Sequence, residues 1–413
     1  MKKKLLYIGH PYHLKSRSID FLKQALERSY DVEYLCAADD CSIPEESIVP
    51  LDGREFEVCV CFQVMPSVVM LKRHVAFRFG VFFPMADYYY GMLPVGTPVW
   101  EEYRNFKIVS FSKKVHDELT DNGFDSVCMR YFPKPVDVGD WGDERSVFFW
   151  QRITHLNVYA VLDVLKNFPI RHLRLHRAID PGEQEILCPL AHQREFGVSY
   201  STWYDTRDEM LRDMDRYSIY FAPRKVEGIG LGYLEAMARG RCVFAHDDTT
   251  HNEYIVHGET GFLYDLNSHD KTVDVSVEDV RRVQRNALEF IRKGHEEWLR
   301  ELDALPAVLE TPAKPDMSKA RAPASVDPCS PAAYLQDPTN CAAGAKRGFA
   351  AGLPRRLWRW AKRRFRHGGN WRCVKKHSVL GVPLALKYVR EDGRAEKICV
   401  LGVPVVMAEI LDA

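Results

Sequence analysis

Short apolar runs of strand length alternate with amphipathic stretches along most of this chain, and this alternation limits the fold more than any other feature. The first runs are LLYIG, VEYLC, VCVCF and VAFRFGVFF, and stretches such as SIDFLKQALERS, with helical spacing of apolar residues, lie between runs. Strands that are covered by helices on both faces are continuously apolar. The pattern therefore predicts an α/β fold in which helices wind around a parallel sheet.

The alternation pauses over residues 131–146 and then starts again, which predicts a second domain of the same class. The new runs include VFFW, HLRLH, YSIYF and CVFAH, and residues 277–305 have the periodicity of closing helices. A chain of 413 residues also exceeds what one core normally supports. We expect doubly wound domains at residues 1–140 and 141–305, with a functional cleft at the carboxyl ends of their strands.

Composition changes in the last quarter of the chain. Residues 306–345 are rich in Pro, Ala and small polar residues, which predicts a flexible linker. Residues 346–413 form the last predicted part, a basic amphipathic segment followed by a small appendage. The appendage carries the sequence VLGVP twice, at residues 379–383 and 400–404, which predicts a β-rich structure of unknown role.

The basic segment, residues 346–376, contains Lys and Arg but no acidic residue. Residues 353–365, LPRRLWRWAKRRF, place their apolar side chains near one helical face. We favour a helix that lies on an anionic membrane surface. The alternatives are a solvated basic tail and nonspecific contact with RNA, although we do not expect a nucleic acid partner.

Cysteine usage and the N-terminal stretch predict a cytoplasmic protein. The eleven cysteines include no C-x-x-C pair and no regular framework spacing, so disulfides are not expected. The first apolar run is too short for a signal peptide, and no run reaches the roughly 18 residues that span a bilayer. We expect peripheral attachment to the inner membrane.

The strongest chemical signal is in residues 226–265, VEGIGLGYLEAMARGRCVFAHDDTTHNEYIVHGETGFLYD. A glycine-bearing turn follows the buried run YSIYF and leads into a helix. Backbone N–H groups at Gly228, Ile229 and Gly230 could bind an anion there, helped by the helix dipole. Glu227 precedes the helix, whereas Glu235 lies two turns further on and could accept neutral hydroxyls such as those of a ribose. Glutamate at a helix start can also simply cap it.

The spacing of these glutamates, with EAMARGRCVFA and NEYIVHGETGFLYD, resembles the retaining GT-B glycosyltransferases of the glycogen-synthase and sucrose-synthase group. The resemblance implies the GT-B fold, two Rossmann-like domains facing a cleft. It also implies hexosyl transfer from a nucleotide-sugar substrate, a UDP- or GDP-sugar, with retention of configuration and without a metal or another cofactor. The LGVP repeats are similar to appendages of bacterial surface-polysaccharide enzymes, which implies a glycan or lipid-linked acceptor.

The same resemblance implies roles for individual residues. Glu227 would contact the donor sugar and stabilise the reacting centre, Glu235 would hold the ribose, and the backbone of residues 228–230 would line the diphosphate. Arg152 matches the phosphate-binding arginine. The family's following lysine is replaced by Asn157, so we expect Lys225 or Arg224 to supply the second positive charge.

Other polar residues also follow predicted strands. In the loop GHPYHLKSRS, His10 could shuttle a proton, and His13, Lys15 and Arg17 could contact the acceptor or the leaving phosphates. These could also be ordinary loop residues, and two histidines alone do not make a metal site. Tyr88 could stack on an acceptor sugar or pack internally. Glu253 could face the donor or cap a short helix.

Three other functions stay open at the level of sequence: a catalytically silent GT-B scaffold, a nucleotide-sugar epimerase and an RNA-associated factor. The sequence does not name the donor sugar, the base, the acceptor or the oligomeric state. It also leaves open whether Asn157 abolishes phosphate binding or only alters it.

Overall fold

The computed structural model describes residues 2–38 and 41–320, and the strands of a C-terminal sheet between residues 371 and 409. The chain divides into two compact units, Met1–Asp337 and Pro338–Ala413. The first unit contains both of the predicted α/β domains.

The first sheet has six parallel strands in the order β2-β1-β3-β4-β5-β6. The strands are β1 (Lys3–Gly9), β2 (Tyr30–Cys36), β3 (Arg54–Phe62), β4 (Val75–Phe83), β5 (Lys107–Ser110) and β6 (Ser126–Cys128). The helices are α1 (Pro11–Ser16), α2 (Asp20–Ser29), α3 (Glu45–Ile48), η1 (Val49–Leu51), α4 (Val68–His74), α5 (Ala86–Gly91), α6 (Val99–Glu102) and α7 (Lys113–Asp121). Strand β3 is buried at every position from Val58 to Phe62, as its continuous apolar run predicts.

The second sheet also has six parallel strands, in the order β12-β11-β10-β7-β8-β9. The strands are β7 (Asp143–Gln151), β8 (His172–Arg177), β9 (Val198–Ser201), β10 (Tyr217–Phe221), β11 (Cys242–His246) and β12 (Phe262–Tyr264). The helices are α8 (Val158–Val164), α9 (Leu190–Glu195), α10 (Arg207–Met214), α11 (Leu231–Ala238), α12 (His251–Tyr254) and α13 (Val277–Leu309). Two wholly parallel sheets confirm the predicted fold class.

Each sheet has one place where the strand order reverses, and such places are the usual ligand sites of doubly wound sheets. In the first sheet, β1 lies between β2 and β3, so the crevice opens between β1 and β3. In the second sheet, β7 pairs with both β8 and β10, so the crevice opens between β7 and β10. The loops that follow these four strands are therefore the best-placed parts of the chain to bind a ligand.

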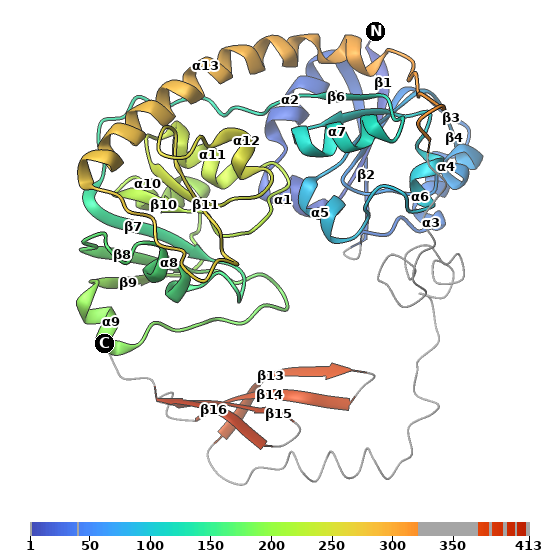
Figure 1. Cartoon of the computed structure of the whole chain (residues 1–413). Helices are drawn as coiled ribbons and strands as arrows, with labels where there is room; N and C mark the ends of the chain where they lie inside the picture. The colour runs from blue at the N-terminus through green and yellow to red at the C-terminus, as the bar shows by residue number, and fades with distance from the viewer. Residues whose placement is uncertain are drawn as a thin grey trace. The chain divides into compact units, whose positions relative to one another are not determined.

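Helix α13 ties the two domains together (Figure 1). It begins with a capping box formed by Ser276 and Asp279, and it contacts α11, β7, β10 and β11 of the second domain and α2 of the first. Trp298 packs against Phe21 and Tyr131, with ring centroids 5.6 and 5.3 Å away. Consequently one of the hydrophobic clusters of the core contains residues from both sheets and from α13.

The end of α13 differs from the predicted start of the linker at residue 306. The helix continues through Pro306 to Leu309, and residues 310–320 then run along the first domain. Backbone N–H groups of Lys314 and Asp316 donate to the Asp125 carboxylate (2.7 Å) and the Gly123 carbonyl (2.8 Å). Apolar burial of Leu305 and Leu309 explains why the helix runs past the proline.

The C-terminal unit contains a four-stranded antiparallel sheet in the order β13-β14-β15-β16. Its strands are β13 (Trp371–Val379), β14 (Val382–Arg390), β15 (Ala395–Val400) and β16 (Val403–Glu409). Val382 is the first residue of β14, and Val403 is the first residue of β16. The two VLGVP copies therefore lie at equivalent positions in the antiparallel pairs β13–β14 and β15–β16. The predicted basic helix at residues 353–365 lies outside the described residues, as does most of the 346–376 segment.

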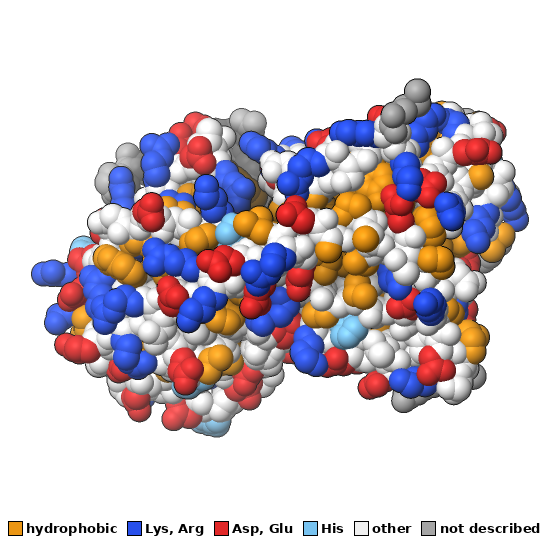
Figure 2. All heavy atoms as spheres, turned by 90° about the horizontal axis from the view of Figure 1, so that it is seen from above, with side chains coloured by type: hydrophobic (Ala, Val, Ile, Leu, Met, Phe, Trp, Pro, Cys, Tyr) orange, Lys and Arg blue, Asp and Glu red, His pale blue; other side chains and the backbone are white. Residues whose placement is uncertain are grey.

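Basic and acidic side chains are interspersed on the face shown in Figure 2, in keeping with equal totals of 57 basic and 57 acidic residues. Within the described part of the chain, every helix is too short or too polar to cross a bilayer.

Candidate donor site

The loops at the carboxyl ends of the two sheets meet around the turn after β10. Arg224, in this turn, has its Nη1 atom 3.4 Å from Oδ2 of Asp87, which follows β4 of the first domain. A Cβ atom at Gly228 would lie 2.8 Å from Oδ1 of Asp87 and 3.2 Å from Cβ of Met85. Glycine thus lets the backbone of the second domain approach the first domain without displacing the Asp87 side chain.

The same turn ends at the start of α11. Gly230 is the N-cap residue, with a left-handed φ of 89°, and no side chain caps the first turn of the helix. A Cβ atom at Gly230 would overlap the ring of Tyr233, and one at Gly232 would lie 2.9 Å from the Tyr220 hydroxyl. The first-turn N–H groups of a helix without a capping side chain are suited to binding an anion.

Glu227 lies in this turn and is partly buried. Among the described residues, no donor forms a hydrogen bond or ion pair with its carboxylate. Burial raises the pKa of Glu227 above its ordinary value, while the nearby Arg224 and Arg152 oppose the rise and Asp87 and Asp180 add to it. The site therefore holds a carboxylate, available to accept hydroxyl hydrogen bonds, beside two guanidinium groups.

Those two guanidinium groups share one carboxylate, that of Asp180, which follows β8. Arg152 follows β7 and donates to Oδ1 of Asp180 from Nε (2.9 Å) and Nη2 (2.8 Å). Arg224 donates from Nη2 to Oδ2 of the same residue (2.5 Å). The Arg152 guanidinium also lies 4.7 Å from the ring centroid of Trp150. The arginines thus flank the crevice between β7 and β10.

The structure separates the residues considered for the second positive charge. Asn157 is the N-cap of α8: its Oδ1 accepts from the N–H of Tyr159 (3.0 Å) and its Nδ2 donates to the Thr154 carbonyl (2.8 Å). Lys225 has no ion pair with any described residue. Arg224, by contrast, is placed beside Arg152 and Glu227, so it is the better candidate for the missing charge.

Glu235 lies on α11, and its side chain is 12 % exposed. It forms an ion pair with Arg207, whose side chain at the start of α10 is 52 % exposed. An exposed arginine can leave such a pair at small cost. Glu235 can therefore exchange Arg207 for the hydroxyls of a ligand.

The Glu253 carboxylate has hydrogen-bond partners in the first domain, which differs from the predicted contact with the donor. Its carboxylate accepts from the Ser112 hydroxyl (2.7 Å), the Lys113 N–H (2.6 Å) and the Thr249 hydroxyl. Ser112 is the N-cap of α7 in the first domain. The carboxylate thus caps a helix, but one in the other domain, and it holds the two domains together.

The polar residues of the first loop are mostly engaged within the first domain. His10 is the N-cap of α1, and its Nδ1 accepts from the Tyr12 N–H (3.1 Å). His13 contacts the Ser18 hydroxyl (2.9 Å) and the Gln63 side chain, and burial lowers the pKa of His13. Because Gln63 follows β3, the contact from His13 crosses the crevice between β1 and β3.

The other residues that were predicted to contact the acceptor substrate lie at the surface or pack against the core. Arg17 pairs with Asp20 (2.7 Å), and its side chain is 73 % exposed; Lys15 is also exposed. Tyr88 is partly buried on α5 and packs against a core cluster. The charge of Asp87 acts on the pKa values of both His13 and Glu227, so the first loop and the glycine turn share an electrostatic environment.

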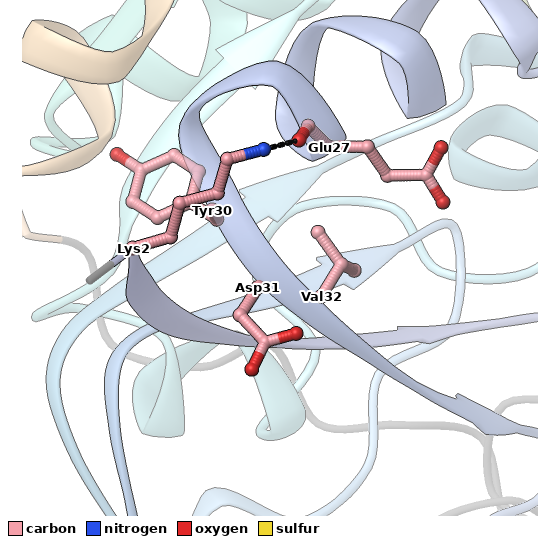
Figure 3. A pocket seen from close by; sticks show the side chains of 5 residues that line it. All are labelled: Lys2, Glu27, Tyr30, Asp31 and Val32. Carbon is pink, nitrogen blue, oxygen red and sulfur yellow. Dashed lines mark hydrogen bonds between the residues drawn. The ribbon is translucent and has the colours of Figure 1, made fainter.

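The rest of the described chain offers a hollow but no metal site. Within the described residues, no three His, Cys, Asp or Glu side chains are grouped so that they could hold a metal ion. A hollow of about 450 Å³ is lined by Lys2, Glu27, Tyr30, Asp31 and Val32 (Figure 3). It lies at the amino ends of β1 and β2, the opposite edge of the sheet from the glycine turn, and contains none of the predicted site residues.

Sequence reasoning missed the contribution of Asp180 and the role of Asp87. Both follow apolar runs, in HRAID and FFPMAD, and the position directly after a parallel strand was a usable signal. That signal could place them at the edge of the sheet, but it could not pair them with particular arginines.

Comparison with known proteins finds a family match in the second domain. Residues 151–281 match the family model described as glycosyl transferases group 1, and this range contains Arg152, Asp180, Glu227 and Glu235. No curated protein sequence matches the chain significantly.

Among solved structures, sucrose-phosphate synthase from Thermosynechococcus elongatus has a TM-score of 0.54 at 13 % identity, over 74 % of this chain and 98 % of that one. The Anabaena protein HepE, solved with UDP, has a TM-score of 0.48 at 11 % identity, over 74 % and 100 %. TarM has a TM-score of 0.42 at 13 % identity, over 60 % and 54 %, so this chain spans about half of TarM. The two parallel sheets and the likeness to sucrose-phosphate synthase show that the chain has the GT-B fold, and residues 151–281 are similar to group 1 glycosyl transferases.

Proposed function

We propose that the chain is a retaining glycosyltransferase that moves a hexose from a UDP- or GDP-sugar to a glycan or lipid-linked acceptor. The observation that carries the proposal is the Glu227 carboxylate, which has no hydrogen-bond partner among the described residues and lies near enough to Arg152 and Arg224 for their charges to act on its pKa. Unpaired, partly buried carboxylates are costly to a fold, so a ligand contact is a sound reason for keeping one. The match of residues 151–281 to group 1 glycosyl transferases supports the same assignment.

The donor would lie along the crevice between β7 and β10. Arg152, Arg224 and the first turn of α11 would hold the diphosphate, and positive charge there would stabilise the leaving group without a metal ion. Glu235 would take the ribose hydroxyls in place of Arg207. Glu227 would accept hydrogen bonds from the hydroxyls of the sugar and stabilise positive charge at the anomeric carbon.

In the reaction, the bond between the anomeric carbon and the diphosphate oxygen breaks, and its electron pair leaves with the nucleoside diphosphate. The acceptor hydroxyl forms the new bond on the same face of the sugar, and its proton passes to the departing diphosphate. We assign His10, at the carboxyl end of β1, to assist this proton transfer. His13, Lys15, Arg17 and Tyr88 are the first-domain residues that we assign to acceptor contact.

The setting of the reaction is proposed from the sequence. The basic segment at residues 346–376 suits an anionic membrane surface, and a lipid-linked acceptor would be presented there. We therefore propose a role in bacterial surface polysaccharide synthesis, on the cytoplasmic face of the inner membrane.

Incubation of the full chain with a panel of UDP- and GDP-sugars and an added glycan acceptor, followed by NMR of the glycoside products, tests the proposal. We expect one donor to release its nucleoside diphosphate, and the anomeric configuration of the product to equal that of the donor. An inverted product would overturn retention alone. Absence of turnover and of nucleotide binding in a folded sample would overturn the enzymatic assignment.

One observation favours a second candidate, the catalytically silent GT-B scaffold. Both arginines of the site are already paired with Asp180, and Asn157 is used as a helix cap. A silent relative would fold normally and bind an acceptor glycan, yet release no nucleotide from any donor.

A further inference from the structure

We infer that Asp180 occupies the phosphate position of the donor site and sets the affinity of the site for diphosphates by competing for Arg152 and Arg224. This inference rests on the proposed function. The Asp180 carboxylate would weaken the binding of a diphosphate, so removing its charge should strengthen ligand binding.

The geometry places the Asp180 carboxylate where a phosphate group would go. One oxygen, Oδ1, accepts two N–H groups from Arg152, and the other, Oδ2, accepts one from Arg224. A phosphate group bound by two arginines can have the same arrangement, in which one oxygen accepts from one guanidinium group and a second oxygen accepts from the other. The side chains of Arg152 and Asp180 are each 19 % exposed, so solvent screens their pairing only partly.

The charges of the site balance without any ligand. Among the paired groups, Arg152 and Arg224 carry two positive charges, and Asp180 and Asp87 carry two negative ones, both within ion-pair distance of Arg224. The Glu227 carboxyl group lies beside these pairs and adds no positive charge. A diphosphate that entered this arrangement unchanged would add negative charge beside Asp180 and Glu227. Binding is therefore favourable only if Asp180 gives up at least one arginine.

The arginines keep unused donors for such an exchange. Nε of Arg224 is buried and has no hydrogen-bond partner among the described residues. A buried guanidinium N–H without an acceptor is a costly feature that an entering oxygen would relieve. In the exchange, the Asp180 carboxylate, which leaves the Arg224 Nε–H without an acceptor, gives way to a diphosphate. The diphosphate has more oxygens and can accept from this N–H group as well.

The test is calorimetric titration of the full chain with inorganic pyrophosphate, UDP and GDP, for the wild type and Asp180→Asn. We expect Asp180→Asn to bind pyrophosphate and one nucleoside diphosphate at least about tenfold more tightly, which corresponds to ~1.4 kcal/mol. The gain should be smaller for the matching nucleoside monophosphate. Glu185→Gln is the matched control, because it removes one negative charge from the same domain at the Arg177 pair without touching Arg152 or Arg224.

The outcomes separate this inference from the proposed function. If the wild type binds a nucleotide and Asp180→Asn binds it equally or less tightly, Asp180 only positions the arginines and the inference is overturned, while the donor site stands. If neither protein binds any of the three probes, both proposals are overturned. Should Asp180→Asn fail to fold, a crystal structure of the wild type with UDP decides: we expect Arg152 or Arg224 on phosphate and released from Asp180, and both still on Asp180 would contradict the inference.

Discussion

The carboxyl edges of the two sheets are built from similar residue types but differ in how those residues are used. In the first domain, His10 caps a helix, His13 contacts Gln63 and Ser18, and Arg17 pairs with Asp20. In the second domain, Glu227 lacks a hydrogen-bond partner among the described residues, and no side chain caps α11. The second edge therefore holds the groups that a ligand could satisfy.

From this difference we infer that the two domains carry different parts of the proposed function. A donor that many enzymes share can be bound by the same set of side chains in each of them. The match to group 1 glycosyl transferases covers residues 151–281, which lie in the second domain. The polar side chains His10, His13 and Arg17 of the first edge already have partners within their own domain. The comparison predicts that substitution of Glu227 or Glu235 in the second domain affects nucleotide binding or turnover. Substitution of Arg17 in the first domain should affect only stability or acceptor use.

Glu227→Gln should have the largest effect. We expect donor turnover to fall by about 10²–10³-fold, because one preorganised charge is lost from the reacting centre, while nucleotide affinity changes little. Single-turnover measurement of nucleoside diphosphate release checks this result. Unchanged turnover would remove Glu227 from the site.

The same variant makes a pH prediction. The folded-state pKa of Glu227 is raised, so the carboxyl favours folding when protonated, and this contribution is lost as the pH rises through the folded pKa. Glu227→Gln should therefore raise the Tm at pH 7, and the gain should shrink as the pH falls toward the ordinary value of 4.5. Thermal unfolding at several pH values measures the difference.

Glu235→Ala should weaken nucleotide binding by about tenfold, or ~1.4 kcal/mol, because the ribose hydroxyls lose a charged acceptor. A thermal-shift panel of UDP, GDP and CMP measures this effect, since a ligand of the folded state raises the Tm. Asp208→Ala, which removes an exposed acidic residue of α10, is the control. A full nucleotide-induced shift in Glu235→Ala would argue against the ribose contact.

Glu253→Gln should lower the free energy of unfolding by about 1–3 kcal/mol, because the Ser112 hydroxyl and the Lys113 N–H of the first domain lose a charged acceptor. Denaturant unfolding checks this value against Glu259→Gln, which changes an exposed residue in the turn that follows α12. If nucleotide affinity falls instead while stability is unchanged, Glu253 contacts the donor and the assignment as a domain latch is wrong.

Arg17→Ala should have the smallest effect. Its ion pair with Asp20 is exposed, so we expect a loss of less than about 1 kcal/mol and unchanged nucleotide affinity. Titration with the nucleotide and thermal unfolding check both statements. A large loss of nucleotide binding would place the first loop on the donor and remove the contrast between the two edges.

Much of the fold could be predicted, because continuous apolar runs and helical periodicity report burial directly. The position of the glycine turn was also accessible, since it depends on local order along the chain: run, glycines, helix. Asn157 carried a usable signal as well, because Asn before an apolar helix commonly serves as an N-cap. The pairing of Asp180 with two arginines, and of Glu253 with α7, depends on how separate strands and domains come together, and no local pattern encodes it.

The most direct test of the donor site is calorimetric titration of the full chain with UDP and GDP, comparing the wild type with Arg152→Met. Arg152 follows β7 at the crevice, and methionine keeps an unbranched apolar stem beside Trp150 while removing the charge. We expect saturable binding of one nucleotide to the wild type and at least about tenfold weaker binding to the variant. Equal binding by both proteins, or no binding by a folded wild type, would contradict it.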